Sequence, residues 1–301
     1  MSANEHASAT APVPFEKATG PIDVTLKNDM MFHLVMSNSK KALKGLVCSL
    51  KGLDSDTVKD VELTNTIDYS LYTTKEIILD VMVILNNDEI IDIELQMYRD
   101  CNWELRSLLY LCRSFDSIGE GEDYDMLKPT TLIAIMNNPL FPEYPEFYSK
   151  YMLLNVKNFQ PYSSYLKLNV LYLNRTDLAT QEDKDNMLVY WAKVFKATDW
   201  DELRSLCSNN ETFEEVAKIM YNSNVQSQEK TIMEAHQKYI LDKRSMENGI
   251  KKRDEKITAL TAENSSLSAK LSSANTENAK LLALLRQNGI SDEQIASYLS
   301  N

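Results

Sequence analysis

The chain has 301 residues, of which 44% are hydrophobic and 25% charged, the composition of an ordinary globular protein. It has no apolar run near the eighteen or so residues that cross a bilayer, which excludes a helical membrane protein. The formal net charge is −12, and residues 226–301 carry 11 basic against 10 acidic side chains, so the first 225 residues hold −13. An acidic body disfavours tight, nonspecific binding to nucleic acid.

The chain opens with MSANEHASATAPVPFEKATG, which is small, polar and proline-containing. It lacks the basic start and apolar middle of a signal peptide, so we expect residues 1–21 to be a disordered leader. The four cysteines are widely spaced and form no C-x-x-C pair, which argues against a zinc ribbon. Free thiols without an export signal indicate a cytoplasmic protein.

Apolar periodicity predicts the next elements in chain order. Residues 25–53 have helical spacing in two segments. Residues 58–66 and 76–85 read as strands, and Asn86-Asn87-Asp88 is typical of a hairpin turn. The segment after this turn, residues 88–98, is then the second arm of the hairpin.

Residues 103–115 predict an amphipathic helix. Its apolar stripe is Leu105, Leu108, Leu109 and Cys112, and its other face carries Arg106, Tyr110 and Arg113. Residues 128–137 and 166–174 predict two further strands. This order of helices and strands indicates a mixed α/β fold, with a core domain over residues 22–180.

The back half of the chain reads as helical, and we expect a helical extension over residues 181–250 and a coiled coil over 251–287. A seven-residue repeat places Ile257, Asn264, Leu271, Asn278 and Leu285 at one seam position, and Leu260, Leu267, Ala274 and Leu281 at the other. Asparagine at the first position favours a parallel homodimer through residues 257–285. The alternative is one amphipathic helix packed on its own domain.

The last segment, residues 288–301, predicts a short separate helix. Gly289 ends the preceding helix, and Ser291 with Gln294 forms a capping box.

The stretch DEIIDIELQMY, residues 88–98, alternates acidic with aliphatic residues. Side chains of a strand repeat with period two, so Asp92, Glu94 and Gln96 share one face. An exposed sheet face would explain the pattern, and so would a metal site.

Asp80 favours the metal site because it lies within the apolar strand IILDVMVIL, where a lone carboxylate is costly to desolvate. The hairpin would bring Asp80 close to Glu94, and two adjacent carboxylates repel unless a divalent cation lies between them. Oxygen ligands suit Mg²⁺ or Mn²⁺, which can prime a water for attack on a phosphodiester. Gln96 could orient that water, although most such triplets are solvated strand edges. Asp92 is either a further ligand or a solvated residue.

Several motifs occur in an order that resembles the PD-(D/E)XK nuclease family transposases, also called recombination-promoting nucleases. They are KNDMMF (27–32), KEIILDV (75–81), IDIELQMY (91–98), the segment 105–135 with its Arg-x-x-x-Tyr helix, and YWAKVFKATDWDEL (190–203). The resemblance covers about residues 22–250. It implies a restriction-endonuclease-like core that cuts DNA with Mg²⁺, in a family where glutamine commonly replaces the lysine of the parent motif.

The resemblance also implies roles for particular residues. Asp80 and Glu94 match the metal-binding acids, and Gln96 matches the third catalytic position. Arg106 and Tyr110 match the helix that follows, where Arg106, Tyr110 and Arg113 could contact DNA. For the two arginines, solvating the helix or pairing with acids is an equal alternative. Asp29 matches the amino-terminal motif, either as an extra acid or as a helix cap.

These observations favour a Mg²⁺-dependent endodeoxyribonuclease that acts as a dimer. The first alternative is a catalytically degenerate module that binds DNA or another protein, which the −13 body and the uncharged Gln96 support. The second is a transposase of a mobile element, for which no residue indicates a strand-joining step.

Overall fold

The computed structural model describes residues 13–64, 81–100, 102–119 and 121–299. Its centre is a mixed sheet of six described strands in the order β1-β2-β3-β4-β6-β5. The strands are β1 Val61–Leu63, β2 Val81–Leu85, β3 Glu89–Gln96, β4 Thr130–Met136, β5 Tyr148–Met152 and β6 Leu166–Tyr172. β3, β4 and β6 run parallel, and the outer pairs are antiparallel. The predicted mixed α/β fold is confirmed.

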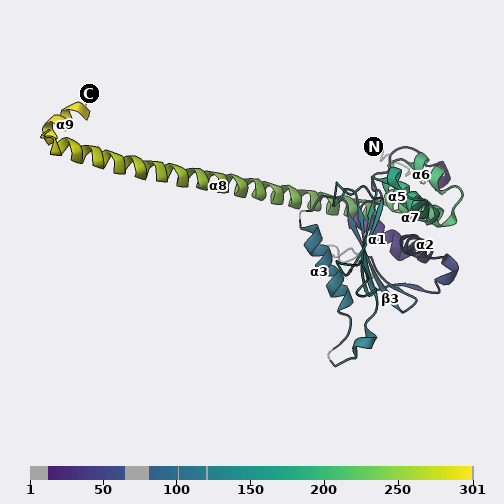
Figure 1. Cartoon of the computed structure of the whole chain (residues 1–301). Helices are drawn as coiled ribbons and strands as arrows, with labels where there is room; N and C mark the ends of the chain where they lie inside the picture. Colours follow the sequence, from purple (N-terminus) through teal and green to yellow (C-terminus); the bar gives the residue numbers. More distant parts are fainter. Residues whose placement is uncertain (1–12, 65–80, 101, 120, 300–301) are drawn as a thin grey trace, which may run out of the picture. The chain divides into compact units, whose positions relative to one another are not determined.

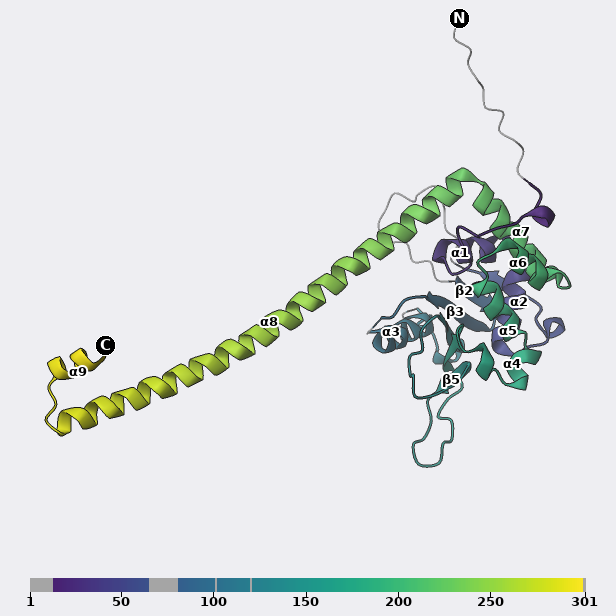
Figure 2. The same ribbon diagram turned by 90° about the horizontal axis from the view of Figure 1, so that it is seen from above.

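Helices cover both faces of this sheet (Figures 1 and 2). α3 Trp103–Phe115 lies on one face, and α1, α2, α5 and α7 lie on the other. The remaining bounds are α1 Asp29–Asn38, α2 Lys40–Lys51, α4 Gln181–Asp185, α5 Leu188–Lys196, α6 Trp200–Cys207 and α7 Glu211–Val225. Short 3₁₀ helices are η1 Phe15–Lys17, η2 Ser55–Thr57, η4 Tyr124–Met126 and η5 Thr176–Leu178.

The turn between β2 and β3 fixes which residues face each other. Asn86 and Asn87 have φ values of +52° and +59°, left-handed conformations that asparagine tolerates, in the three-residue loop between the paired residues Leu85 and Glu89. The resulting register pairs Val81 with Ile93 and Val83 with Ile91. These aliphatic residues are fully buried and join the larger core, on the side of α1, α2, α5 and α7.

The smaller core lies under α3. Trp103 and Leu111 of α3 pack against Leu132 and Ala134 of β4, together with Met136, Val170 and Tyr172. The predicted apolar stripe of this helix faces outward instead: Leu105, Leu108 and Leu109 are 72%, 54% and 48% exposed, and Cys112 is exposed. Helical spacing therefore predicted an apolar stripe that exists on the helix, but this stripe is not the buried side. The buried side is the opposite one, which carries Trp103.

Two elements of the structure were not predicted as such. β5 lies at the sheet edge, and most of its residues are exposed or half-buried, so it lacks the apolar alternation that reveals a half-buried strand. α6 begins at Trp200, where Asp199 caps it by accepting a hydrogen bond from the backbone N–H of Asp201 at 2.8 Å.

Residues 13–21 belong to the segment expected to be a disordered leader, and in the structure they contact the core. Phe15 packs edge-on against Trp200, with ring centroids 6.4 Å apart. Ala18 is buried, and Pro21 forms a β-bridge with Asp199. This part of the chain is therefore ordered.

Backbone contacts divide the chain into two units, residues 1–237 and 238–301. The second contains most of α8, Ser227–Gln287, and α9, Asp292–Leu299. α8 runs without interruption through Gly249, where the sequence suggested a boundary. Along it the leucines and isoleucine of the predicted seam are exposed, from 38% at Leu285 to 64% at Leu271. None of the described helices is long and apolar enough to span a membrane.

The end of the second unit has the predicted caps. Gly289 has φ +82°, the left-handed conformation that commonly ends a helix. The backbone N–H of Ser291 donates to Oε1 of Gln294 at 3.1 Å, and the N–H of Gln294 donates to Oγ of Ser291 at 3.4 Å. The capping box is confirmed.

Candidate active site

The polar row of β3 faces α3 and is buried. Asp92, Glu94 and Gln96 are 3%, 3% and 4% exposed. On β4 their Cα partners are Leu132, Ala134 and Met136, which belong to the smaller core. An exposed sheet face is therefore the wrong explanation for the alternating acids, and so is a solvated strand edge.

Asp92 is tied to the last turn of α3. Oγ of Ser114 donates to its Oδ2 at 3.1 Å. The alternative that Asp92 is a solvated residue is wrong, since burial and this hydrogen bond hold the carboxylate between strand and helix. Ser114 itself was not singled out in the sequence, where a serine on a helix carries no distinctive signal.

Gln96, at the end of the same row, has both ends of its amide engaged. Its Oε1 accepts a hydrogen bond from Nη2 of Arg106 at 2.7 Å, and its Nε2 donates to the carbonyl of Tyr98 at 2.6 Å. These two bonds fix the orientation of the amide. Gln96 is therefore held as part of a network, through one hydrogen of Nε2 and one lone pair of Oε1.

Arg106 connects this network to the acids. Its Nη1 donates to Oδ2 of Asp100 at 2.7 Å, and its Nη2 lies 3.9 Å from Oε2 of Glu94. The guanidinium also lies 4.8 Å from the ring centroid of Trp103 and 5.8 Å from that of Tyr110. The structure thus brings Glu94, Gln96, Arg106 and Tyr110 together, and Arg106 pairs with an acid, Asp100, which was one of the two alternatives for this arginine.

Asp100 and Trp103 are contributors that the sequence did not reveal. Asp100 is half-buried and lies six residues before Arg106, and Trp103 is 1% exposed one turn before it. An acid placed on the loop before a helix that carries arginine is the signal that could have identified Asp100.

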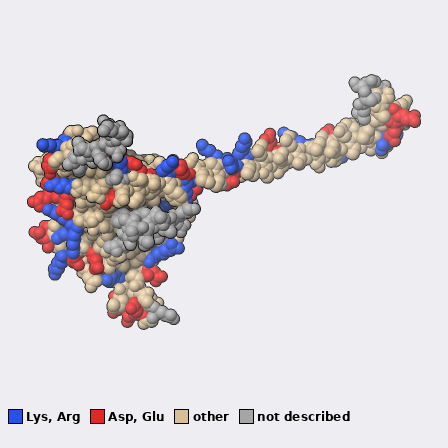
Figure 3. All heavy atoms as spheres, turned by 180° about the vertical axis from the view of Figure 1, so that it is seen from behind, with Lys and Arg blue, Asp and Glu red and all other residues tan. Residues whose placement is uncertain are grey.

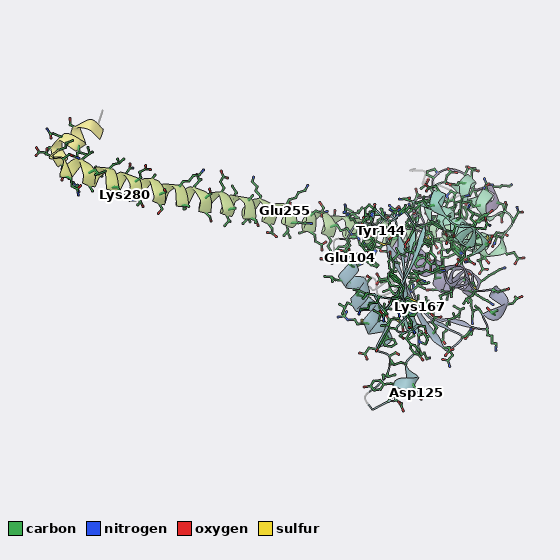
Figure 4. All side chains as sticks on the ribbon, viewed as in Figure 1. Glu104, Asp125, Tyr144, Lys167, Glu255 and Lys280 are labelled. Carbon is green, nitrogen blue, oxygen red and sulfur yellow. The ribbon has the colours of Figure 1, made fainter. Side chains whose placement is uncertain are left out.

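The other predicted site residues, Asp80, Asp29 and Arg113, do not belong to this described network. Asp80 lies outside the described residues. Asp29 is the first residue of α1 and half-buried, but the capping side chain is that of Asn28, which accepts from the N–H of Met31 at 3.1 Å. Arg113 is exposed on α3. In Figure 4 the labelled Glu104 marks the amino-terminal end of this helix.

The site residues have the chemistry that a divalent cation requires. Asp92 and Glu94 offer carboxylate oxygens from one face of one strand, and hard oxygen donors suit Mg²⁺ or Mn²⁺. Within the described residues no group of three His, Cys, Asp or Glu side chains could hold an ion. Asp80, the further acid that the sequence predicts, lies outside these residues.

Surface charge on the first unit is mixed. On the face shown in Figure 3, Lys and Arg side chains are interspersed with Asp and Glu. This distribution agrees with the −13 carried by the first 225 residues.

The comparison with known families gives one result. The family model described as PD-(D/E)XK nuclease family transposase matches residues 26–249, most of the chain, and includes every predicted site residue. No curated protein and no solved structure matches the chain.

Proposed function

The chain belongs to the PD-(D/E)XK nuclease family transposases, and from that premise we propose that it is a Mg²⁺-dependent endodeoxyribonuclease of the recombination-promoting type. Its substrate is DNA, and it acts in the cytoplasm as a homodimer. The observation that carries the proposal is the buried row of Asp92, Glu94 and Gln96, which meets the guanidinium of Arg106 under α3.

In this proposal Asp80 and Glu94 hold the cation, with Mn²⁺ as a substitute. Asp80 directly precedes Val81 in the chain, and Val81 pairs with Ile93, the neighbour of Glu94. This adjacency supports Asp80 as the second acid. Asp92 and Asp29 are candidates for an additional acid. When bound, the cation would lower the pKa of a water and neutralise charge on the phosphate.

The chain's own residues have separate roles around that centre. Gln96, fixed by Arg106 and Tyr98, holds the end of β3 against α3. Trp103 and Tyr110 flank the guanidinium and restrict its movement. Arg113, exposed on the same helix, is available to the DNA backbone, where arginine commonly binds phosphate.

The second candidate function is a degenerate module that binds DNA or protein without cleaving. It is favoured by one observation. The amide of Gln96 carries no charge, and both its Oε1 and its Nε2 are hydrogen-bonded to other residues of the fold. The two candidates differ in whether the acids of the site are needed for an activity.

Plasmid cleavage with Mg²⁺ distinguishes them. We expect the wild type to nick and linearise supercoiled DNA, and Asp80→Ala and Glu94→Gln to lower the rate by at least about a hundredfold, the scale of losing one charge-stabilising group. Glu104→Gln is the matched control, because Glu104 is exposed on α3. Equal cleavage by wild type, Asp80→Ala and Glu94→Gln would reject this site, and a wild type without Mg²⁺-dependent cleavage would leave the noncatalytic module.

The dimer gives a mechanical reason for a double-strand break, because two sites can each cut one strand. We propose a nuclease core over 22–180, a helical extension over 181–250, and a parallel coiled coil over 251–287 that joins two chains through 257–285. Deleting residues 257–286 should leave nicking by monomers and reduce linearisation. Unchanged linearisation by a chain shown to be monomeric would refute this arrangement.

A further inference from the structure

Phosphodiester hydrolysis places growing negative charge on the phosphoryl oxygens, so the site needs a positive group in a fixed position. The described part of β3 offers Asp92 and Glu94, which are acids, and Gln96, which is neutral. Both ends of the Gln96 amide are already hydrogen-bonded within the fold. The strand itself therefore supplies no cation where one is required.

The helix opposite supplies it. We infer that Arg106 is a catalytic residue, whose guanidinium stabilises the charge of the transition state beside Glu94 in place of the neutral side chain at position 96. This inference rests on the proposed nuclease function. The observation behind it is that one guanidinium nitrogen, Nη2, lies 2.7 Å from Oε1 of Gln96 and 3.9 Å from Oε2 of Glu94.

The guanidinium is held in place before any substrate arrives. Asp100 binds Nη1 at 2.7 Å, and the ring of Trp103, a residue only 1% exposed, lies 4.8 Å from the guanidinium carbon. A prearranged charge costs no reorganisation at the moment of reaction. Arg106 therefore acts through its fixed positive charge.

Arg106 is also accessible from outside. Its side chain is 36% exposed, whereas that of Glu94 is 4% exposed. The guanidinium thus lies between the buried carboxylate of Glu94 and the surface. From this position it could contact a phosphate of the DNA while the acids hold an ion.

A purely structural role would give the same contacts, because Arg106 also ties α3 to β3. A structural role and an electrostatic role of Arg106 can be distinguished by moving the positive charge from position 106 to position 96. Replacing Arg106 by glutamine removes the charge, and adding Gln96→Lys returns a positive charge to the position that Nη2 now touches. A structural tie is not restored by this exchange, whereas an electrostatic role is.

The experiment compares the wild type, R106Q, R106K, R106Q with Q96K, E104Q and Glu94→Gln in the full chain. Single-turnover cleavage is measured with Mg²⁺, DNA affinity by fluorescence anisotropy with Ca²⁺, and folding by thermal unfolding. We expect R106Q to cleave about 100- to 1,000-fold more slowly with a DNA Kd within about threefold of wild type. The double variant should regain at least about tenfold.

The other variants are controls that separate loss of the Arg106 charge from loss of folding. R106K keeps the charge if R106Q fails to fold but loses the planar fork that binds Asp100 and Gln96, so it should cleave more slowly than wild type and at least about tenfold faster than Glu94→Gln. E104Q changes an exposed side chain of the same helix and should change neither DNA affinity nor the cleavage step. The inference is overturned if R106Q cleaves like wild type, if Q96K restores nothing, or if R106K is as inactive as Glu94→Gln.

Failure of the underlying proposal has a different signature. A wild type without Mg²⁺-dependent cleavage, indistinguishable from Glu94→Gln, removes the nuclease function and the inference together. Cleavage that depends on Glu94 but not on Arg106 overturns the inference alone.

Discussion

Oγ of Ser114 donates a 3.1 Å hydrogen bond to Oδ2 of Asp92, which joins the last turn of α3 to the middle of β3. The bond is partly buried and its acceptor is a carboxylate, so we expect Ser114→Ala to lower the free energy of unfolding by about 1–2 kcal/mol. Urea titration measures this, with Ser117→Ala, at an exposed position, as the control. An unchanged stability would mean that Asp92 is held without Ser114.

The start of α1 offers a matched pair of substitutions. Asn28 caps the helix through the N–H of Met31, whereas Asp29 is its first residue. We expect Asn28→Ala to cost about 1 kcal/mol of stability with little change in cleavage. Asp29→Asn should cost less than about 0.5 kcal/mol, the contribution of a charge near a helix start.

The same pair tests the proposed role of Asp29 as an extra acid of the site. If Asp29 has that role, Asp29→Asn lowers Mg²⁺-dependent cleavage by at least about tenfold while Asn28→Ala does not. Parallel effects of the two substitutions on stability and on cleavage would assign both residues to the helix start alone.

The face of β3 that carries the acids could be predicted from sequence because period two is fixed by strand geometry. Asn86 and Asn87 fixed the register in the same local way. These features depend on residues close in the chain, which explains why the hairpin and its polar row were predicted correctly.

Features that depend on distant contacts could not be predicted in this way. The leucine stripe of α3 has the spacing of a buried face, yet Trp103 and Leu111 pack on β4 instead, a choice decided by a strand some twenty residues away. Burial of Asp92 depends on α3 covering β3. The link from Arg106 to Gln96 also needs the helix to fold back over the strand.

We expect the free energy of unfolding to fall at alkaline pH because of Cys207. Burial at the end of α6 raises the pKa of this thiol to about 12 from 9.0, with a further contribution from the charge of Glu214. Because the folded state holds the proton more tightly, the stability it contributes is complete below pH 9 and is lost as pH rises toward 12.

At pH 10 this loss should be about 1.4 kcal/mol relative to pH 7. We expect Cys207→Ala to remove this part of the pH dependence, measured as the free energy of unfolding in urea at pH 7–10. Cys112→Ala replaces an exposed thiol and keeps Cys207, so the loss should persist in that variant. A Cys207→Ala protein with the wild-type pH dependence would place the effect elsewhere.

The exposed seam of α8 is the feature that most directly predicts an assembly. Leu267 and Leu271 are 54% and 64% exposed in the single chain, and a second copy would bury them. Changing both to lysine alters four side chains in a dimer, each worth about 1.5–3 kcal/mol when buried. The Kd of dimerisation should therefore rise by more than about a thousandfold.

Sedimentation equilibrium of the full chain measures this change. The control adds the same two charges at Ser265 and Ala269, exposed positions of α8 that a heptad register places outside the seam, and it should remain dimeric. Because lysine at either pair raises net charge equally, a difference between the variants reports the seam and not general repulsion. Equal masses for both variants would show that α8 does not pair through this register.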